Sequence, residues 1–179
     1  MKPVLHRLTK IFRHGIAAYC CFLLSLTAGC VERVYVQLSN AMAPTIKAGD
    51  RVIIDPAAYK ERAPARWDVI LFSHPEARGS DSKSLMRVVG LPGEVIQLQG
   101  DDILLGGRQL LAPPLLENIR YRTVSVSSPS TSKKGHARPV YPLTIPENCY
   151  FVLGDNCLES YDSRFWGVLR RDDILGKGL

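Results

Sequence analysis

Short apolar runs separated by polar or glycine-containing turns recur along the chain after residue 32. The runs are rich in valine, isoleucine, leucine and aromatic residues, a composition typical of β-strands. Strands are predicted at 34–38, 51–55, 67–72, 85–89, 94–98, 102–105 and 150–153. Because no segment after residue 31 shows a convincing helical period, this part of the chain is predicted to be all-β or mainly β.

The turns between these runs are also readable. Gln99-Gly100-Asp101 separates two of the apolar runs and predicts a hairpin, and Gly106-Gly107 predicts a second turn. The loop 39–50 contains Pro44, which fixes its own φ and biases the preceding Ala43 toward extended backbone. Small residues in the centre of this loop allow a ligand or another backbone to approach closely, although an ordinary turn would have the same composition.

The stretch 112–146 is rich in proline, serine, threonine and basic residues and has little apolar periodicity. This pattern predicts a long surface excursion, mobile around 125–138.

An uncharged run, 15–31, follows the basic segment 1–14 and ends before Glu32. Its length is close to the lower limit of the about 17 to 25 residues that span a bilayer. It is predicted to be a transmembrane anchor with the N-terminus cytoplasmic and the domain 32–179 exported. Three alternatives remain: a cleaved signal peptide, a buried soluble helix, and a lipoprotein signal, since Thr27-Ala28-Gly29-Cys30 resembles a lipoprotein box.

The chain of 179 residues is long enough for one domain with a membrane segment. Its net charge of +6 comes largely from Lys2, Arg7, Lys10 and Arg13, so the basicity belongs to the N-terminus. We therefore expect no nucleic-acid partner. The five cysteines form no C-x-x-C pair, which argues against a structural metal. Cys149 and Cys157 could form a disulfide or remain as inert thiols.

Three segments in this order, 39–50, 85–94 and 154–167, resemble the bacterial type I signal peptidases, which are membrane-bound serine proteases with a Ser-Lys dyad. The resemblance runs from about residue 15 to the end, and 64–72 adds to it, with Trp67 where glycine is usual. It implies a signal-peptidase-like β domain behind one N-terminal transmembrane helix. It also implies a bacterial inner membrane protein whose main domain is periplasmic or extracytoplasmic, with exported preproteins as partners and no cofactor.

Both dyad positions are substituted. The resemblance places the nucleophile at Ala41, just before Met42, and the general base at Met86, just before Arg87. The dyad needs a serine hydroxyl and a lysine kept neutral by burial, because an ammonium cannot accept the serine proton. Alanine and methionine keep apolar side chains of tolerable size and remove both reacting groups.

The supporting residues are retained. By resemblance, Ser39 helps to form an oxyanion hole with the backbone N–H of residue 41, and Ser160 supports the base. Asp162 and Arg164 match an acid-base pair that braces the site, although such a pair on a strand often only fixes a loop. The remaining motif positions are Pro44 in the opening loop and the turn Gly154-Asp155-Asn156. Cys157 stands where the family usually has arginine.

Two functions follow. The first is a catalytically silent homologue that binds signal-peptide-like segments of exported proteins, whether its dyad was lost naturally or replaced for study. The second is an active signal peptidase with a relocated nucleophile and base. Against the second, Lys83 would point to the strand face opposite Met86, Lys47 is expected to be solvated, and His74 and His136 lie in polar loops. The oligomeric state stays open.

Overall fold

The structure is a computed structural model, and it describes residues 33–75, 82–123 and 139–179. The predicted anchor at 15–31, the predicted mobile segment at 125–138 and His136 lie outside these residues. Residues Glu32–Leu179 form one compact unit. None of the helices in the described ranges is both long enough and apolar enough to cross a membrane.

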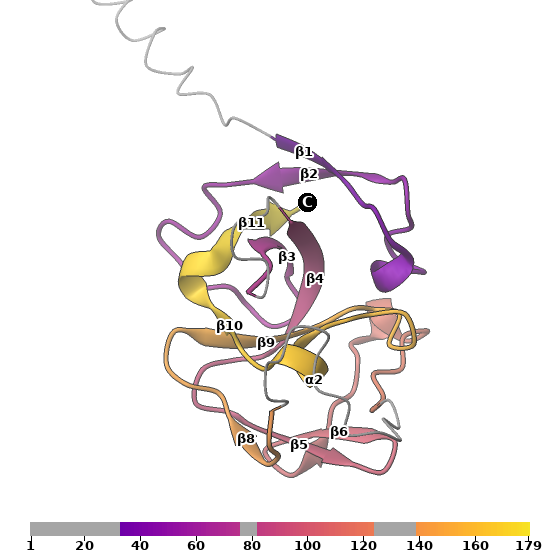
Figure 1. The fold of residues 1–179 in the computed structure, drawn as a ribbon, viewed down its shortest axis with the longest axis vertical. Coiled ribbons are helices and arrows are strands. Elements are labelled where there is room, and N and C mark those ends of the chain that lie inside the picture. Colours follow the sequence, from indigo (N-terminus) through magenta and orange to yellow (C-terminus); the bar gives the residue numbers. More distant parts are fainter. Residues whose placement is uncertain (1–32, 76–81, 124–138) are drawn as a thin grey trace, which may run out of the picture. The chain divides into compact units, whose positions relative to one another are not determined.

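One antiparallel sheet of seven strands, in the order β1-β2-β11-β3-β4-β9-β10, carries the site (Figure 1). Its strands are β1 (Arg33–Val36), β2 (Arg51–Asp55), β3 (Val69–Ser73), β4 (Lys83–Gly90), β9 (Cys149–Leu153), β10 (Leu169–Arg170) and β11 (Ile174–Gly178). Strand β11 lies between β2 and β3, so it joins the β1-β2 pair to the rest of the sheet.

A second antiparallel sheet has the order β7-β6-β5-β8. Its strands are β5 (Val95–Gln99), β6 (Asp102–Leu105), β7 (Arg108–Gln109) and β8 (Leu143–Thr144). β5 pairs with β6 and β6 with β7, which confirms the hairpins predicted at Gly100 and at Gly106-Gly107.

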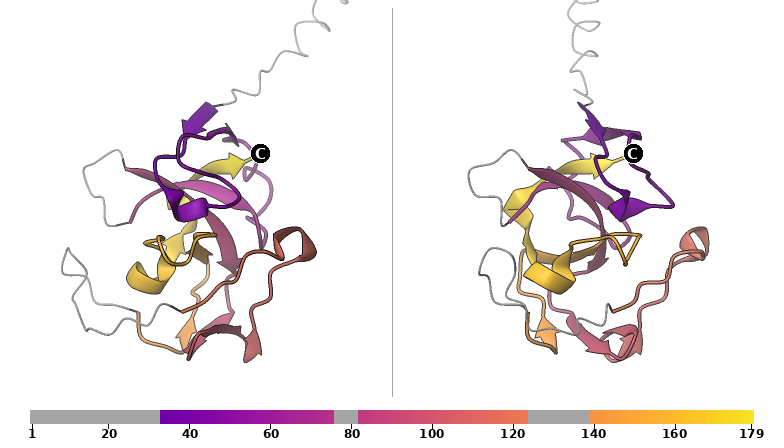
Figure 2. Two further views of the ribbon diagram at one scale, coloured as in Figure 1. Left: turned by 90° about the vertical axis from the view of Figure 1, so that its right-hand side faces the viewer. Right: turned by 45° about the vertical axis from the view of Figure 1, so that its right-hand side comes forward.

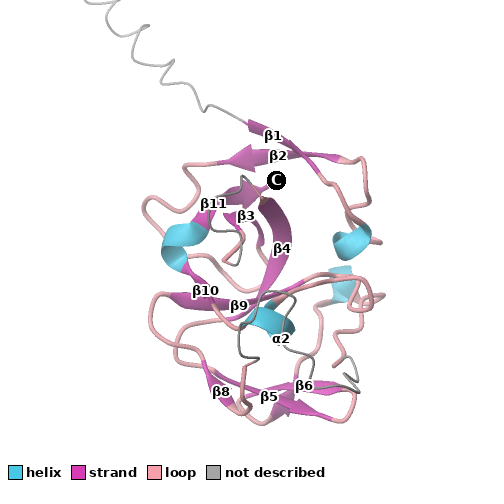
Figure 3. Ribbon diagram, in the orientation of Figure 1, coloured by secondary structure: helices cyan, strands magenta, loops and turns pink. Residues whose placement is uncertain are grey.

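Helical structure in the described residues is limited to short turns, as Figure 3 shows in cyan. They are η2 (Asn40–Met42), η3 (Pro114–Leu116), α2 (Ser163–Trp166) and η4 (Arg171–Asp173). The mainly β prediction is therefore confirmed. The predicted strand at 67–72 begins only at Val69, because Trp67 has a φ of 74° and Asp68 N–H donates to Ala65 O in a turn.

The core has two large clusters and a smaller one, and β4 contributes to all of them. Leu85 packs in the small cluster with Val52, Ile54 and Leu71. Val88 packs in the first large cluster and its neighbour Val89 in the second, because successive side chains of a strand point to opposite faces.

The described parts of 112–146 are not wholly at the surface. Ile119, Tyr121 and Ile145 are buried in the second large cluster. The sequence pattern of 112–146 has too little apolar periodicity to predict these three buried positions. Their burial packs the excursion against the rest of the domain.

Candidate active site

The opening loop is shaped by η2 and its N-terminal cap. Ser39 precedes η2 in an extended conformation, and its Oγ accepts a hydrogen bond from Ala41 N–H at 3.4 Å. Gln37 Nε2 lies 3.5 Å from the same oxygen. The turn buries the side chains of Ala41 and Met42, while Ser39 stays exposed.

The loop after β9 lies directly against η2, as the two rotated views in Figure 2 show. Asn156 N–H donates to the Ala41 carbonyl at 2.9 Å. A Cβ added to Gly154 would lie 2.4 Å from the Ala41 carbonyl oxygen and 2.3 Å from Ser160 Oγ. Glycine is therefore required at 154, because a side chain there would overlap both the Ala41 carbonyl oxygen and the Ser160 hydroxyl.

Ser160 is buried, and its Oγ has no hydrogen-bond partner among the described residues. A buried hydroxyl left unsatisfied costs about 1–3 kcal/mol. Met86 is also buried and belongs to the same cluster as Met42, the residue after Ala41. A thioether is only a weak hydrogen-bond acceptor, whereas the lysine that the family resemblance places at position 86 would carry an amine.

A buried charged network joins β4 to both loops through Asp155. Arg87 donates to the Asp155 carboxylate with Nε at 2.8 Å and Nη2 at 2.6 Å, and Tyr121 Oη donates at 2.6 Å. Thr45 Oγ1, from the opening loop, donates to Asp155 Oδ2 at 2.5 Å.

This network shifts two pKa values. Burial by itself would lower the pKa of Arg87, but the hydrogen bonds and charge of Asp155 outweigh it and raise that pKa. Burial, with the negative charge of Asp155, raises the pKa of Tyr121 far above its ordinary value. Arg87 therefore stays charged and Tyr121 stays a donor, as a stable brace requires.

A second buried pair holds the loop after β9. Asp162 is the N-cap of α2, and its carboxylate accepts from Arg164 Nε and Nη2, both at 2.8 Å, and from Gly154 N–H at 3.1 Å. Arg164 also donates to the carbonyls of Cys157 and Arg122. The two residues thus lie at the start of a short helix, where no helix was predicted, and they fix the Gly154 turn.

The described residues considered for a relocated nucleophile and base are Lys83, Lys47, His74 and Ser39. Lys83 and Lys47 are exposed, and the His74 ring packs against Tyr161 and Trp166. Ser39 Oγ contacts only Gln37 Nε2 and Ala41 N–H in the described part of the chain, and neither is a base.

Cys149 and Cys157 are free thiols. Within the described ranges no group of His, Cys, Asp and Glu side chains could hold a metal ion.

Sequence reasoning assigned no role to Tyr121 and Thr45, which complete the network around Asp155. Tyr121 lies in the polar stretch after 112, where only its aromatic character could have indicated burial. Trp67, at the usual glycine position, keeps a positive φ and stacks on Tyr121 with ring centroids 5.8 Å apart. Its carbonyl accepts from Arg87 Nη1 at 2.9 Å, so the backbone there keeps its contact with the network despite the large side chain.

Comparison with known proteins finds similarity to signal peptidases in each case. The family model described as "Signal peptidase, peptidase S26" matches residues 9–179. Signal peptidase I of Leptolyngbya laminosa is 36% identical over 146 residues, covering 79% of this chain and 64% of that protein. Signal peptidase I V of Bacillus subtilis is 33% identical over 137 residues, covering 76% of this chain and 77% of that protein.

Probable signal peptidase I-2 of Synechocystis is 30% identical over 144 residues, covering 79% of this chain and 58% of that protein. The chain thus spans less than two thirds of the Leptolyngbya and Synechocystis relatives. Among solved structures, a signal peptidase I from Enterococcus faecalis V583 is 32% identical, with a TM-score of 0.45, covering 65% of this chain and 97% of that one.

Proposed function

The chain belongs to the S26 signal peptidase family, and from that membership we propose that it is a catalytically silent member that binds signal-peptide-like segments of exported proteins. The observation that carries the proposal is the contrast at the site. Ala41 and Met86 lack reacting groups, while the cap, the Gly154 turn and the Asp155 network around them are intact.

Loss of both groups leaves no route for acyl transfer at this position. An alanine methyl cannot attack a carbonyl, and a thioether cannot accept a proton near neutral pH. Without a nucleophile and base, such sites retain only the residual catalysis of the oxyanion hole and binding. Binding is therefore the property for which the remaining architecture is suited.

An open edge on β4 supports binding by β-strand addition. β4 pairs with β3 from Lys83 to Arg87, but with β9 only from Arg87 onward. The Ser82 carbonyl points toward β3, because it accepts a hydrogen bond from His74 N–H. The N–H and C=O groups of successive residues in an antiparallel strand point alternately to its two edges, so those of Lys83 and Leu85 point to the edge of β4 away from β3. No described strand pairs there, and Leu85 is only 2% exposed, so an extended segment would reach the Leu85 N–H and C=O by displacing the atoms that now cover them.

The position of β1 supports the same mode. β1 is an edge strand that pairs only with β2 in the described part of the sheet. Tyr35 of β1 donates its hydroxyl to the Lys83 carbonyl at 2.9 Å, which brings β1 close to the open edge of β4. A bound segment would thus find unpaired backbone on two strands next to Ala41.

The cellular setting completes the proposal. The run 15–31 would anchor the chain in the bacterial inner membrane with its N-terminus cytoplasmic, and the domain 32–179 would face the extracytoplasmic side. Exported preproteins would then be the partners, because their signal segments reach the same surface.

A binding and cleavage assay tests this function. The full-length chain in detergent is titrated against a labelled peptide with an apolar stretch followed by Ala-x-Ala, and the mixture is analysed by mass spectrometry. We expect a Kd of millimolar or tighter, worth at least about 4 kcal/mol, with no cleavage product. The control peptide carries tryptophan in place of both alanines and should bind more weakly.

Two results would contradict the proposal. Lack of binding at millimolar peptide would remove the binding function. Cleavage by the unaltered protein would instead establish an active enzyme with a relocated nucleophile and base.

A further inference from the structure

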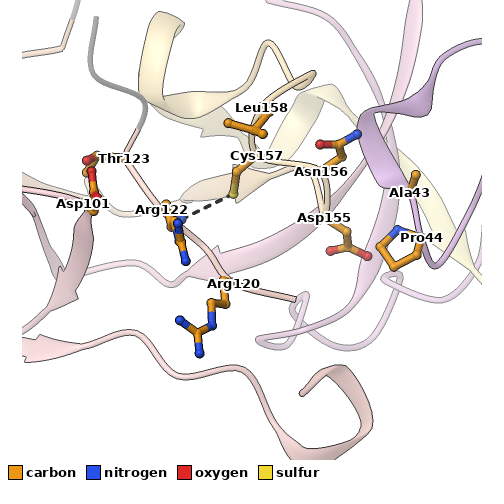
Figure 4. Close-up of a pocket in the computed structure, with 10 residues that line it drawn as sticks. All are labelled: Ala43, Pro44, Asp101, Arg120, Arg122, Thr123, Asp155, Asn156, Cys157 and Leu158. Atoms are coloured by element: carbon orange, nitrogen blue, oxygen red, sulfur yellow. Dashed lines mark hydrogen bonds between the residues drawn. The ribbon is translucent and has the colours of Figure 1, made fainter. Parts of the chain in front are cut away.

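A pocket of about 630 Å³ opens next to the opening loop that holds Ala41. Figure 4 shows Ala43 and Pro44 on one side of it and Arg120 and Arg122 on the other. The loop after β9 lines it between these sides, through residues 155–158. Part of the pocket is thus built from the two loops that surround Ala41, and the arginines come from a third segment.

The two arginines share one side of an extended segment. Arg122 makes a β-bridge with Asp102, and Tyr121 between the arginines turns inward to Asp155. Alternate residues of extended backbone point to opposite sides, so Arg120 and Arg122 are placed together on the side away from Tyr121. Both residues are exposed and line the pocket.

Neither guanidinium has an ion-pair partner within the described residues, whereas Arg66, Arg87 and Arg164 are each paired with a carboxylate. Two carboxylates also line the pocket. Asp155 is already held by Arg87, Tyr121 and Thr45, which leaves Asp101 as the opposing charge. The positive charge of the two arginines therefore exceeds the negative charge available to them.

We propose that this pocket receives acidic side chains of the bound polypeptide, on the C-terminal side of its Ala-x-Ala segment. The inference rests on the proposed function. Guanidinium groups match carboxylates in shape and charge and can bind them with two parallel hydrogen bonds. In the proposed ligand the segment before Ala-x-Ala is apolar. The acidic residues are therefore placed in the segment after Ala-x-Ala.

The path from the site to the pocket is short. Asn156 lines the pocket, and its N–H holds the Ala41 carbonyl at 2.9 Å. Pro44, three residues after Ala41, forms part of the opposite side. A segment lying over Ala41 therefore needs only a few further residues to bring a carboxylate to Arg120 and Arg122.

Two labelled peptides test the proposal with the full-length chain in detergent. Both contain the apolar stretch and Ala-x-Ala, one followed by Glu-Glu and the other by Gln-Gln. Fluorescence anisotropy at low and at high salt should show the Glu-Glu peptide binding about three- to tenfold tighter at low salt, with the difference reduced at high salt. The double variant Arg120→Gln/Arg122→Gln should lose the difference and still bind the Gln-Gln peptide.

The control Arg108→Gln removes one arginine charge, against two in the double variant, from an exposed position on β7 outside this pocket, and should keep the preference. Equal affinities of the unaltered chain for the two peptides would overturn the acidic preference while leaving the proposed function in place. If inorganic phosphate binds through Arg120 and Arg122 while the peptides stay equal, the pocket takes free anions and the proposal is wrong. If neither peptide binds, the proposed function and this inference are both rejected.

Discussion

In the proposed silent site, Ala41 and Met86 stand at the two dyad positions, and the residues around them keep features that a dyad would use. The Ala41 N–H is held in the cap of η2, and the Ser160 hydroxyl is buried without a partner in the described chain. By the family resemblance, a lysine amine at position 86 would be the hydrogen-bonding partner of that hydroxyl. The unpaired Ser160 hydroxyl is therefore what we expect of a site that lacks this lysine.

Restoring both groups should restore cleavage. Ala41→Ser alone should give little, because a hydroxyl without a base is weakly nucleophilic, and Met86→Lys alone should give none and lower stability. The double variant should cleave a signal-peptide substrate about 10²-fold or more faster than either single variant, with a rate that rises toward alkaline pH as the lysine is deprotonated. The rates are measured by chromatography of the products.

Adding Ser160→Ala to the double variant is the control, and it should slow cleavage by weakening the support of the lysine. A folded double variant that binds peptide but remains inert would show that the site has diverged at further positions. Trp67 and Cys157 would be the first to exchange.

Gly154 offers a test of the packing that joins the loops. In Gly154→Ala the new methyl would lie 2.4 Å from the Ala41 carbonyl oxygen, so backbone must move. We expect a loss of about 1–3 kcal/mol in unfolding free energy and weaker peptide binding. Gly178→Ala is the matched control, because its Cβ would lie 3.2 Å from side-chain carbons away from the site. Urea denaturation and the peptide titration measure both effects, and equal losses of binding would contradict the assigned contact.

At the scale of elements, the link between β3 and β11 depends on a buried acid, Asp68. Asp68 accepts hydrogen bonds from Lys177 Nζ at 2.6 Å, Tyr59 Oη at 3.0 Å and Ala65 N–H at 3.1 Å. Burial alone would raise the pKa of Asp68, but these hydrogen bonds outweigh it and hold that pKa below its ordinary value of 3.8.

Because the folded-state pKa of Asp68 is lowered, its stabilising effect is present above the ordinary value and is lost as the pH falls through the lowered one. Asp68→Asn should therefore cost about 1–3 kcal/mol near neutral pH, and its stability should fall less than that of the unaltered chain on acidification below about pH 4. Thermal unfolding across this range is the measurement. Asp172→Asn, in an exposed pair with Arg170, should change little, and an equal flattening there would refute the role of Asp68.

The sequence predicted most strands because their apolar runs and glycine turns are local signals. It also located the η2 loop and the turn at Gly154 through motif order. What it could not predict were contacts between distant positions, such as Tyr121 with Asp155 or Gly154 with Ala41. Such contacts depend on tertiary packing, and a tyrosine in a polar stretch carries no local sign of its partner. The helical start at Asp162 was missed because α2 is too short to show a period.

At the scale of the whole molecule, the proposed anchor sets where the site works. We expect the full-length chain to fractionate with membranes and to resist carbonate extraction, because 15–31 is uncharged and follows a basic flank. A truncated chain that starts at Val34 should remain in the supernatant. Globomycin-sensitive processing with acylation of Cys30 would establish the lipoprotein alternative, and release of the full-length chain by carbonate would exclude an anchor.

The alternation of side chains on β4 and β9 has a consequence for how the domain loses its structure. Val88 and Val152 pack in one large cluster, while their neighbours Val89 and Leu153 pack in the other. Opening either cluster would displace β4 and β9, and these two strands also contribute side chains to the other cluster. Melting should therefore be a single cooperative event, and the two halves of the domain should not act as independent folding units.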